Sequence, residues 1–321
     1  MSDKKVEYIS ASRIKTLQTC SWLFWLKYHL KLPDTPNDGS TRGTVCHLIF
    51  ELLLKKKHKK HFSAIHNGKS ISDSPAVNRL VIKKLNEYKA FTQENYDLCD
   101  DMIKVGLATD FFGKGGKAEP PEKGFTIEED SPYYVIHGFI DKIILYKRQK
   151  IVKIVDYKSS KYKFRGEELE TNIQAMMYSL VARELYPDYK PIVNFVFLRY
   201  PKSPIQELQY SDEQLEGLKH YLSHVYKTMQ EFTLEDAESS FAIDNPKNKW
   251  MCGIGQWVCP MKHPFDYFAL IDKNGQVKKS SFEDDFGKKK KGQKVEKRKY
   301  DGCPKFYGPS EAQSGSDSVF I

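Results

Sequence analysis

The sequence lacks long apolar runs: none of its 321 residues belongs to a stretch approaching the roughly 18–20 apolar residues that a membrane-spanning helix needs. Its first residues, Met1 to Glu7, are charged and carry no apolar segment typical of a secretory signal. Cysteine is scarce, with six in the chain. We therefore expect no membrane association and an intracellular protein. Its cysteines should be mostly reduced, which favours metal or cluster ligation over a disulfide framework.

The composition is that of a folded, basic protein. Hydrophobic residues make up 40% of the chain and aromatic residues 13%, which excludes wholesale disorder. The length suits one large domain or two moderate ones. The formal net charge of +9 favours a polyanionic partner, although the lysine-rich segment 288–299 is more typical of a solvated or mobile run.

Apolar periodicity predicts an order of helices first, then strands, then alternation. Helices are predicted over residues 9–32, from 41 to the basic run 55–60, and over 75–112, 167–186 and 211–235. Strands are predicted over 126–129, 133–146, 151–157 and 192–200. This order predicts an α/β domain with a mixed sheet of modest size. Beyond residue 240 the pattern dissolves, and no regular element is predicted there.

The sharpest local feature is an acid and a lysine at the end of an apolar strand. Asp156 and Lys158 are two residues apart, so their side chains share one face of a strand. Upstream, the apolar run 137–141 ends in Asp141. If the two strands are antiparallel neighbours, both carboxylates converge and require a cation such as Mg²⁺ or Mn²⁺. The competing interpretation is a surface Asp–Lys pair, worth about 0–1 kcal/mol.

Two helical pairs accompany this motif. His47 and Glu51 lie four residues apart on one predicted helix face, and so do Gln174 and Tyr178 on the helix that follows the strand. Each pair alone could be incidental, because a helix histidine and a core-edge tyrosine are common. Their order along the chain together with Asp141, Asp156 and Lys158 is hard to attribute to chance.

The combination resembles the PD-(D/E)xK nucleases of the RecB-like branch, which include the RecB and AddB nuclease domains and the CRISPR-associated and phage exonucleases. The motifs that match, within residues 9–200, are Arg42-Gly43…His47, Gly138-Phe139-Ile140-Asp141, Asp156-Tyr157-Lys158 and Gln174…Tyr178. The resemblance implies a restriction-endonuclease-like α/β core, with a central mixed sheet flanked by helices. We expect this core over residues 1–240, with a helical part at about 41–118. An irregular Cys- and Lys-rich segment over 241–308 and a disordered tail over 309–321 are expected to follow.

The resemblance also implies roles for individual residues. His47, Asp141 and Asp156, with the backbone carbonyl of Tyr157, would bind the divalent metal. Lys158 would position or activate the attacking water. Gln174 and Tyr178 would support the site and contact the nucleic-acid backbone, completing the implied catalytic set with Asp141, Asp156 and Lys158. Glu51 is either an outer partner or an ordinary surface carboxylate.

Four cysteines suggest a second metal centre. Many members of the branch join one early and three late cysteines around a [4Fe–4S] cluster, and the residues implied here are Cys20, Cys252, Cys259 and Cys303. The late spacing departs from the usual Cys-x2-Cys-x5-Cys: Gly255 stands where a cysteine is expected, and 43 residues separate Cys259 from Cys303. Zinc bound by the four thiolates, His263 as a substitute ligand, or simple buried thiols remain alternatives.

For nucleic-acid contacts we expect Arg13, Arg42, Lys161 and Tyr178. The aromatic residues near Cys20 could stack on bases, but burial of their rings is the better interpretation. The preferred function is a Mg²⁺- or Mn²⁺-dependent DNA exonuclease that acts on single-stranded DNA or duplex ends. Its expected setting is recombination, repair or phage replication, in the cytoplasm of a bacterium or phage-infected cell. The alternatives are a non-catalytic DNA-binding subunit and a structure-specific endonuclease. The sequence has no helicase-like phosphate loop, so any unwinding would require a helicase or recombination partner protein.

Overall fold

The computed structural model describes residues 7–253 and 259–307. They form two compact units, one of residues 36–223 and one that joins residues 1–35 to 224–321. The division falls inside α9 (Asp212–Glu231), and the expected domain boundary after residue 240 stays a prediction. Gly255 and the expected tail over 309–321 lie outside the described residues. Within the described ranges, no helix is long and apolar enough to cross a membrane.

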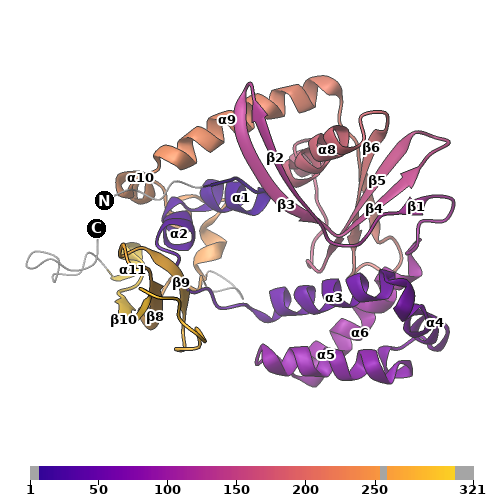
Figure 1. Cartoon of the computed structure of the whole chain (residues 1–321), viewed down its shortest axis with the longest axis horizontal. Coiled ribbons are helices and arrows are strands. Elements are labelled where there is room, and N and C mark those ends of the chain that lie inside the picture. The colour runs from indigo at the N-terminus through magenta and orange to yellow at the C-terminus, as the bar shows by residue number, and fades with distance from the viewer. Residues whose placement is uncertain (1–6, 254–258, 308–321) are drawn as a thin grey trace, which may run out of the picture. The chain divides into compact units, whose positions relative to one another are not determined.

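The unit of residues 36–223 is built on a five-stranded mixed sheet (Figure 1). Its strands, in spatial order, are β1 (Lys117–Ala118), β4 (Lys142–Tyr146), β5 (Ile151–Lys158), β6 (Lys190–Phe197) and β7 (Ile205–Leu208). Only β5 and β6 run parallel, and α8 (Ile173–Leu185) crosses between them after the short α7 (Glu167–Glu170). The predicted α/β fold with a modest mixed sheet is confirmed.

A separate hairpin precedes the central strands. β2 (Lys123–Asp130) pairs with β3 (Tyr133–Ile140) in full antiparallel register. The single predicted strand over 133–146 is therefore two strands, and the chain bends at Asp141 between β3 and β4. This bend carries the chain from the hairpin into the central sheet, and it delivers the Asp141 carboxylate to the end of β5.

A helical layer completes this unit. It comprises α3 (Asp38–Leu54), η2 (Lys56–His58), α4 (Lys59–Gly68), η3 (Ile71–Asp73), α5 (Pro75–Glu87) and α6 (Gln93–Ala108). Its apolar faces bury Phe50, Val81 and Ile103 in one core that also includes Tyr157 of β5. The predicted helix over 75–112 is two helices, because Lys89 takes a left-handed φ of 53° and Thr92 caps α6. Helix α4 was not predicted, since its lysines obscure the apolar face.

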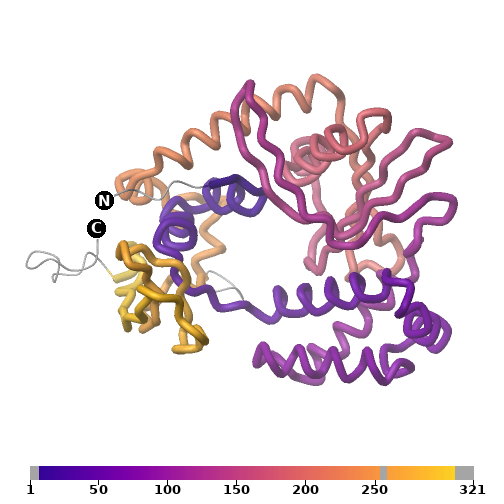
Figure 2. The backbone as a smooth tube through the Cα atoms, viewed as in Figure 1, coloured from indigo at the N-terminus to yellow at the C-terminus, as the bar shows by residue number. Residues whose placement is uncertain are grey.

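The second unit joins the start of the chain to its end. It contains α1 (Ala11–Thr19), α2 (Ser21–Phe24), η1 (Trp25–His29), α10 (Leu234–Ser239), η4 (Ala242–Asp244), η5 (Lys249–Cys252), β8 (Phe265–Ile271), β9 (Val277–Ser281), β10 (Lys294–Tyr300) and α11 (Pro304–Tyr307). The Trp22 indole donates to the hydroxyl of Tyr300, which donates to the carbonyl of Met261. Figure 2 shows these early and late segments lying together. Trp22 and Phe24 are buried, which confirms the packing interpretation of these rings.

Two predictions for this unit are wrong. The helix expected over 9–32 breaks at Cys20, whose backbone is extended (φ −160°, ψ 109°) and whose Sγ accepts from the Leu23 amide as the cap of α2. The region beyond residue 240 is not irregular, because β8, β9 and β10 form an antiparallel sheet in the order β10-β8-β9. Strands β9 and β10 carry exposed lysines, so these two strands lack the apolar alternation that identifies a half-buried sheet.

Candidate active site

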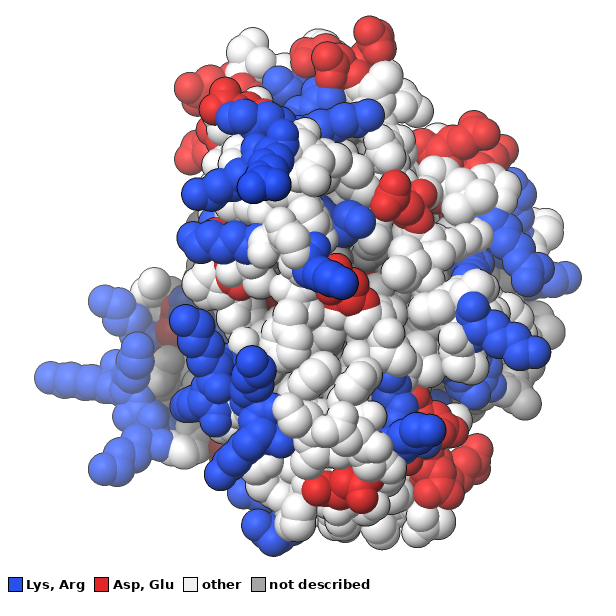
Figure 3. All heavy atoms as spheres, turned by 90° about the vertical axis from the view of Figure 1, so that its right-hand side faces the viewer, with Lys and Arg blue, Asp and Glu red and all other residues white. Residues whose placement is uncertain are grey.

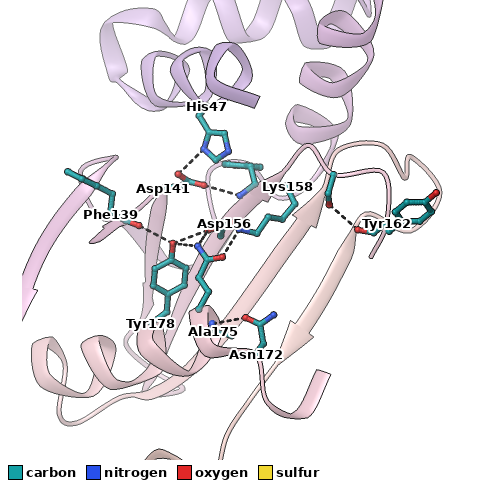
Figure 4. Close-up of polar contacts among 12 residues, drawn as sticks. His47, Phe139, Asp141, Asp156, Lys158, Tyr162, Asn172, Ala175 and Tyr178 are labelled. Carbon is teal, nitrogen blue, oxygen red and sulfur yellow. Dashed lines mark hydrogen bonds and ion pairs between the residues drawn. The ribbon is translucent and has the colours of Figure 1, made fainter. Parts of the chain in front are cut away.

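Asp156 and Lys158 lie side by side at the end of β5, as their spacing predicts. The Asp156 Oδ2 atom is 2.8 Å from Lys158 Nζ, and the Asp156 residue is only 4% exposed (Figure 4). Lys158 also lies over the ring of Phe195, 5.1 Å from its centroid. This pair is therefore buried on one side and partly open on the other, unlike the exposed surface pair that was the competing interpretation.

Asp141 joins this pair from the bend between β3 and β4. The register of β4 on β5 pairs Lys142 with Val155, so Asp141 lies next to the end of β5. Its Oδ2 accepts a hydrogen bond of 2.9 Å from the backbone N–H of Tyr157. The expected convergence is present, with one correction: the run before Asp141 pairs with β2, and only the run after it pairs with β5.

His47 reaches the carboxylates from α3. Its Nδ1 lies 2.9 Å from Asp141 Oδ1. Burial would lower the pKa of His47, but the hydrogen bond to Asp141 and the charges of both carboxylates raise that pKa above its ordinary value. Gly43 permits the approach of α3, because a Cβ there would lie 2.8 Å from Ser159 Oγ unless that hydroxyl moved. The glycine of the motif thus lets α3 pack closely against the residue that follows β5.

Gln174 and Tyr178, one turn apart on α8, complete the network. Gln174 accepts from Lys158 Nζ at 2.7 Å through Oε1 and donates to Asp156 Oδ1 at 3.0 Å through Nε2. The Tyr178 hydroxyl lies 2.9 Å from Asp156 Oδ1 and 3.0 Å from the carbonyl of Phe139. Burial, followed by the negative charge of Asp156, raises the pKa of Tyr178 well above its ordinary value. The hydroxyl therefore stays protonated and can donate.

The oxygen atoms of the site suit a hard cation. Burial and then the charge of Asp141 raise the pKa of Asp156, while Lys158 opposes this shift. The buried Asp156 Oδ2 accepts no hydrogen bond despite its ion pair with Lys158, so a lone pair is open to a ligand. The carboxylates and imidazole fit Mg²⁺ or Mn²⁺ chemically. Among the described residues, however, no three His, Cys, Asp or Glu side chains are grouped to hold one ion.

A cleft opens beside the imidazole. It has a volume of about 660 Å³ and is lined by His47, Glu51, Lys84, Tyr88 and Glu122, among others. Glu51 forms an ion pair with Lys55 on the same helix. Of the residues of the network, His47 lines this cleft, so the imidazole side of the site faces open space.

Lys142 is a member of the site region that the sequence analysis missed. It follows Asp141 directly, is 1% exposed, and donates to the carbonyl of Phe111 and the hydroxyl of Tyr157 at 3.0 Å each. Burial lowers the pKa of Lys142 to about 8. The sequence offered one signal for this residue: Lys142 begins a strand whose other residues are apolar, and lysine is rarely buried in such a strand without a special role.

The residues expected to contact DNA have other partners or surroundings in the structure. Arg42 donates to the side chain of Asn95 on α6. Arg13 donates to the carbonyl of Tyr8 and lies over the ring of Tyr28. Lys161 is exposed on the loop after β5, and Tyr178 is in the network described above. On the face drawn in Figure 3, Lys and Arg side chains gather toward one side. DNA contacts by these four residues stay predictions.

The four implied cluster cysteines meet in the second unit. Cys20, Cys252, Cys259 and Cys303 all line one pocket, whose other walls are mainly apolar. Burial raises the pKa of Cys259 to about 12 and that of Cys303 to about 11. The long gap before Cys303 is filled by the sheet of β8, β9 and β10, and the Cys303 amide bonds to the Lys262 carbonyl at 3.2 Å. His263 instead contacts the Tyr307 hydroxyl.

The other two cysteines lie elsewhere. Cys46 and Cys99 are fully buried in the helical core of the first unit, as packing residues would be. They are adjacent, and the hydrogen bond between them, followed by burial, raises the pKa of Cys46 well above its ordinary value. The six cysteines thus separate into a packing pair and a set of four that shares a pocket.

A family model of the PD-(D/E)XK nuclease superfamily matches residues 8–263. The chain belongs to this superfamily. The match spans both units and includes every residue of the network from His47 to Tyr178. The mixed sheet flanked by helices is the restriction-endonuclease-like fold of PD-(D/E)XK nucleases.

Comparison with solved structures finds a distant neighbour of this PD-(D/E)XK protein. The crystal structure of a "Putative exonuclease" from Eubacterium rectale is similar at 13% sequence identity and a TM-score of 0.47. The similarity covers 76% of this chain and 88% of that chain. No curated protein matches the sequence significantly.

Proposed function

We propose that this PD-(D/E)XK protein is a Mg²⁺- or Mn²⁺-dependent DNA exonuclease. The observation that supports this most directly is the network in which Asp141, Asp156 and Lys158 meet at the end of β5. A purely structural role would not require a lysine held between a buried carboxylate and a glutamine, whereas hydrolysis of a phosphodiester uses such a cation. The exonuclease mode and a place in recombination, repair or phage replication rest on the resemblance to the RecB-like branch, as does a helicase or recombination partner.

The proposed metal ligands are His47, Asp141 and Asp156, with the carbonyl of Tyr157. A bound divalent ion supplies a Lewis acid that offsets negative charge on the phosphoryl oxygens. The hydrogen bond between His47 Nδ1 and Asp141 Oδ1 holds these two proposed ligands next to each other. It leaves the Nε2 atom of the imidazole for a metal ion.

The chain's own groups would do the remaining work. Lys158 would hold the attacking water and stabilise charge at the phosphate, since its ammonium is the cation of the network. Gln174 would orient that ammonium through its hydrogen bond, and Tyr178 would hold Asp156 in position through its hydroxyl. The water then attacks phosphorus in line, and the phosphodiester bond to the leaving oxygen breaks.

The test is degradation of linear DNA by purified protein in Mg²⁺ or Mn²⁺. We expect Asp156→Asn and Lys158→Ala each to reduce the rate by about a hundredfold or more. Asp101→Asn and Lys83→Ala, at exposed helix positions, are the matched controls and should retain the wild-type rate. Melting curves establish that the variants fold. Equal activity in all five proteins would refute the assigned centre.

The exonuclease mode needs a different substrate. A closed circular single strand has no end, so an exonuclease leaves it intact while degrading the linear form of the same sequence. Cleavage of the circle would favour the endonuclease alternative. DNA binding without any metal-dependent cleavage would favour the non-catalytic subunit.

For the second metal centre we propose a [4Fe–4S] cluster held by Cys20, Cys252, Cys259 and Cys303. Their shared, mainly apolar pocket and soft sulfur donors support this assignment. A tetrahedral zinc ion at about 2.3 Å from each sulfur needs tightly grouped thiolates. Zinc bound by the same four thiolates is the alternative, and metal analysis of the purified protein decides between the two.

The cluster is tested on protein purified without oxygen. We expect a brown sample containing iron and acid-labile sulfide, and loss of both in Cys303→Ser. Cys46→Ala, in the other unit, is the control and should keep them. Stoichiometric zinc without iron would replace the cluster, and a metal-free protein would leave four free thiols.

A further inference from the structure

The two most exposed large apolar side chains in the described part of the chain both lie beside the proposed active site. Tyr162 is 74% exposed and Phe139 is 60% exposed, ahead of every other residue of this kind. Phe139 precedes Asp141 by two residues, and Tyr162 follows Lys158 by four. In Figure 4 they lie on opposite sides of the carboxylates. Large exposed apolar groups at such a place call for a ligand.

Phe139 is held in place although its ring is exposed. Its carbonyl accepts the hydrogen bond of Tyr178, so its backbone belongs to the catalytic network. The ring packs edge-on against His137, with centroids 5.3 Å apart. Across the hairpin it faces Gly124, where a Cβ would come within 3.2 Å of Phe139 Cε1. The glycine leaves room for the ring to lie on the neighbouring strand.

Tyr162 is also presented by an anchored loop. Its carbonyl accepts from Ser160 Oγ at 2.9 Å, and the preceding carbonyl, of Lys161, accepts from Tyr200 at 2.7 Å. Two residues later, Phe164 packs its ring against Phe195. The backbone on both sides of Tyr162 is thus tied to the sheet, while the phenol ring itself extends into solvent. Ordered backbone under an exposed ring is what a stacking platform requires.

We propose that Phe139 and Tyr162 are base-stacking platforms that hold an unpaired strand across the active site. This inference rests on the proposed function and deepens it by naming the substrate as single-stranded nucleic acid. Every base offers a π-face to an aromatic ring, whereas bases in a duplex are already stacked on each other. One ring on each side of the carboxylates would hold the bases that flank the scissile phosphate. The exposed Lys161 is placed to meet a phosphate near Tyr162.

Binding without cleavage tests the proposal. The full-length protein is titrated, in EDTA, into a labelled oligothymidylate, an equally long strand of abasic sites, and a blunt duplex. We expect wild-type protein to prefer oligothymidylate over the abasic strand. Phe139→Ala and Tyr162→Ala should each weaken oligothymidylate binding by roughly fivefold to a hundredfold, from the usual strength of base stacking. Their affinity for the abasic strand should not change.

Rescue and control variants separate stacking from folding. Tyr162→Phe and Phe139→Tyr keep a ring and should bind as the wild type does. Tyr133→Ala removes an exposed ring at the far end of β3 and should have no effect. If the two alanine variants bind oligothymidylate as tightly as wild type, the platforms are refuted even when the protein degrades DNA. If the protein binds as expected but no preparation cleaves DNA, the platforms stand and the exonuclease fails.

Discussion

The side-chain oxygen of Gln174 accepts a hydrogen bond of 2.7 Å from the ammonium of Lys158. The amide nitrogen of the same residue donates to Asp156, so one glutamine connects the carboxylate and the ammonium of the strand motif. Because a side-chain amide does not titrate near neutral pH, Gln174 can only orient these two groups. Gln174 is therefore a positioning residue for Lys158.

Gln174→Ala should lower kcat by about 10- to 100-fold, the usual effect of losing a group that orients a catalytic residue. KM should change little, because the substrate does not have to contact the glutamine. Steady-state nuclease assays measure both constants. Gln93→Ala, at the exposed start of α6, serves as the control. A rise in KM at constant kcat would instead make Gln174 a substrate-binding residue.

Metal affinity should depend on pH through His47. The pKa of His47 is raised in the metal-free protein, where its bond to Asp141 outweighs burial. Protonated imidazole cannot bind a metal, so affinity for Mn²⁺ should fall, by at most about tenfold per pH unit, as pH drops through that pKa. Calorimetric titration over a pH series measures the slope, which should flatten in His47→Asn. An unchanged slope would remove His47 from the ligand set.

The same pair has the opposite effect on the stability of the metal-free protein. Because the folded pKa of His47 is raised, its contribution to stability is complete below the unfolded pKa of 6.5 and is lost as pH rises through the folded pKa. Metal binding and the His47–Asp141 bond therefore favour different pH ranges. Melting curves with EDTA and with Mn²⁺ separate the two effects.

Gly138 makes room for a ring that supports the catalytic network. A Cβ at Gly138 would lie 2.7 Å from Cζ of Phe125, and the Phe125 ring packs edge-on against Tyr178. Gly138→Val should destabilise the fold by about 1–3 kcal/mol, as overpacking does. Gly217→Ala, in α9 with open space around it, should have the opposite sign and stabilise by up to about 1 kcal/mol. Denaturant titration compares the two, and equal shifts would refute the close-contact argument.

Short-range spacing predicted much of the site, because its residues lie on regular elements. The i, i+2 face of β5 placed Asp156 beside Lys158, and the i, i+4 face of α8 placed Gln174 beside Tyr178. Spacing could not predict where Asp141 would lie, because a bend between two sheets sets that position. The convergence of Asp141 with Asp156 was expected only on the assumption that their two strands are antiparallel neighbours, and the structure shows that the strand after Asp141 is the neighbour.

Other features depend on tertiary contacts that leave little trace in local sequence. The helix break at Cys20 occurs in an apolar run that reads as continuous helix, yet it turns the thiol toward its pocket. The sheet between Cys259 and Cys303 was read as an irregular charged segment, because lysines occupy the exposed positions of β9 and β10. Arg42 belongs to the first motif and was expected to contact DNA, but its guanidinium donates to Asn95 on α6, a contact that local sequence does not reveal.

Lys142 should make stability rise with pH in the alkaline range. Burial lowers the pKa of Lys142 to about 8, whereas the unfolded chain keeps the ordinary 10.5. Between these values the unfolded state binds more protons, so raising the pH favours folding. The difference of about 2.5 pKa units corresponds to a gain on the order of 3 kcal/mol.

Lys142→Met isolates this contribution, because methionine has similar length and no charge. Denaturant titrations from about pH 7.5 to 10.5 should show that the free energy of unfolding of the wild type rises relative to that of the variant as pH rises. At the lowest pH the variant avoids the free-energy cost of burying an ammonium, which stabilises it. It also leaves the Phe111 carbonyl without its hydrogen-bond donor, which destabilises it, so the two effects on stability oppose each other there. Lys147→Met, at an exposed turn, is the control. A pH-independent difference for Lys142→Met would mean that the ammonium is as well solvated in the fold as in the unfolded chain.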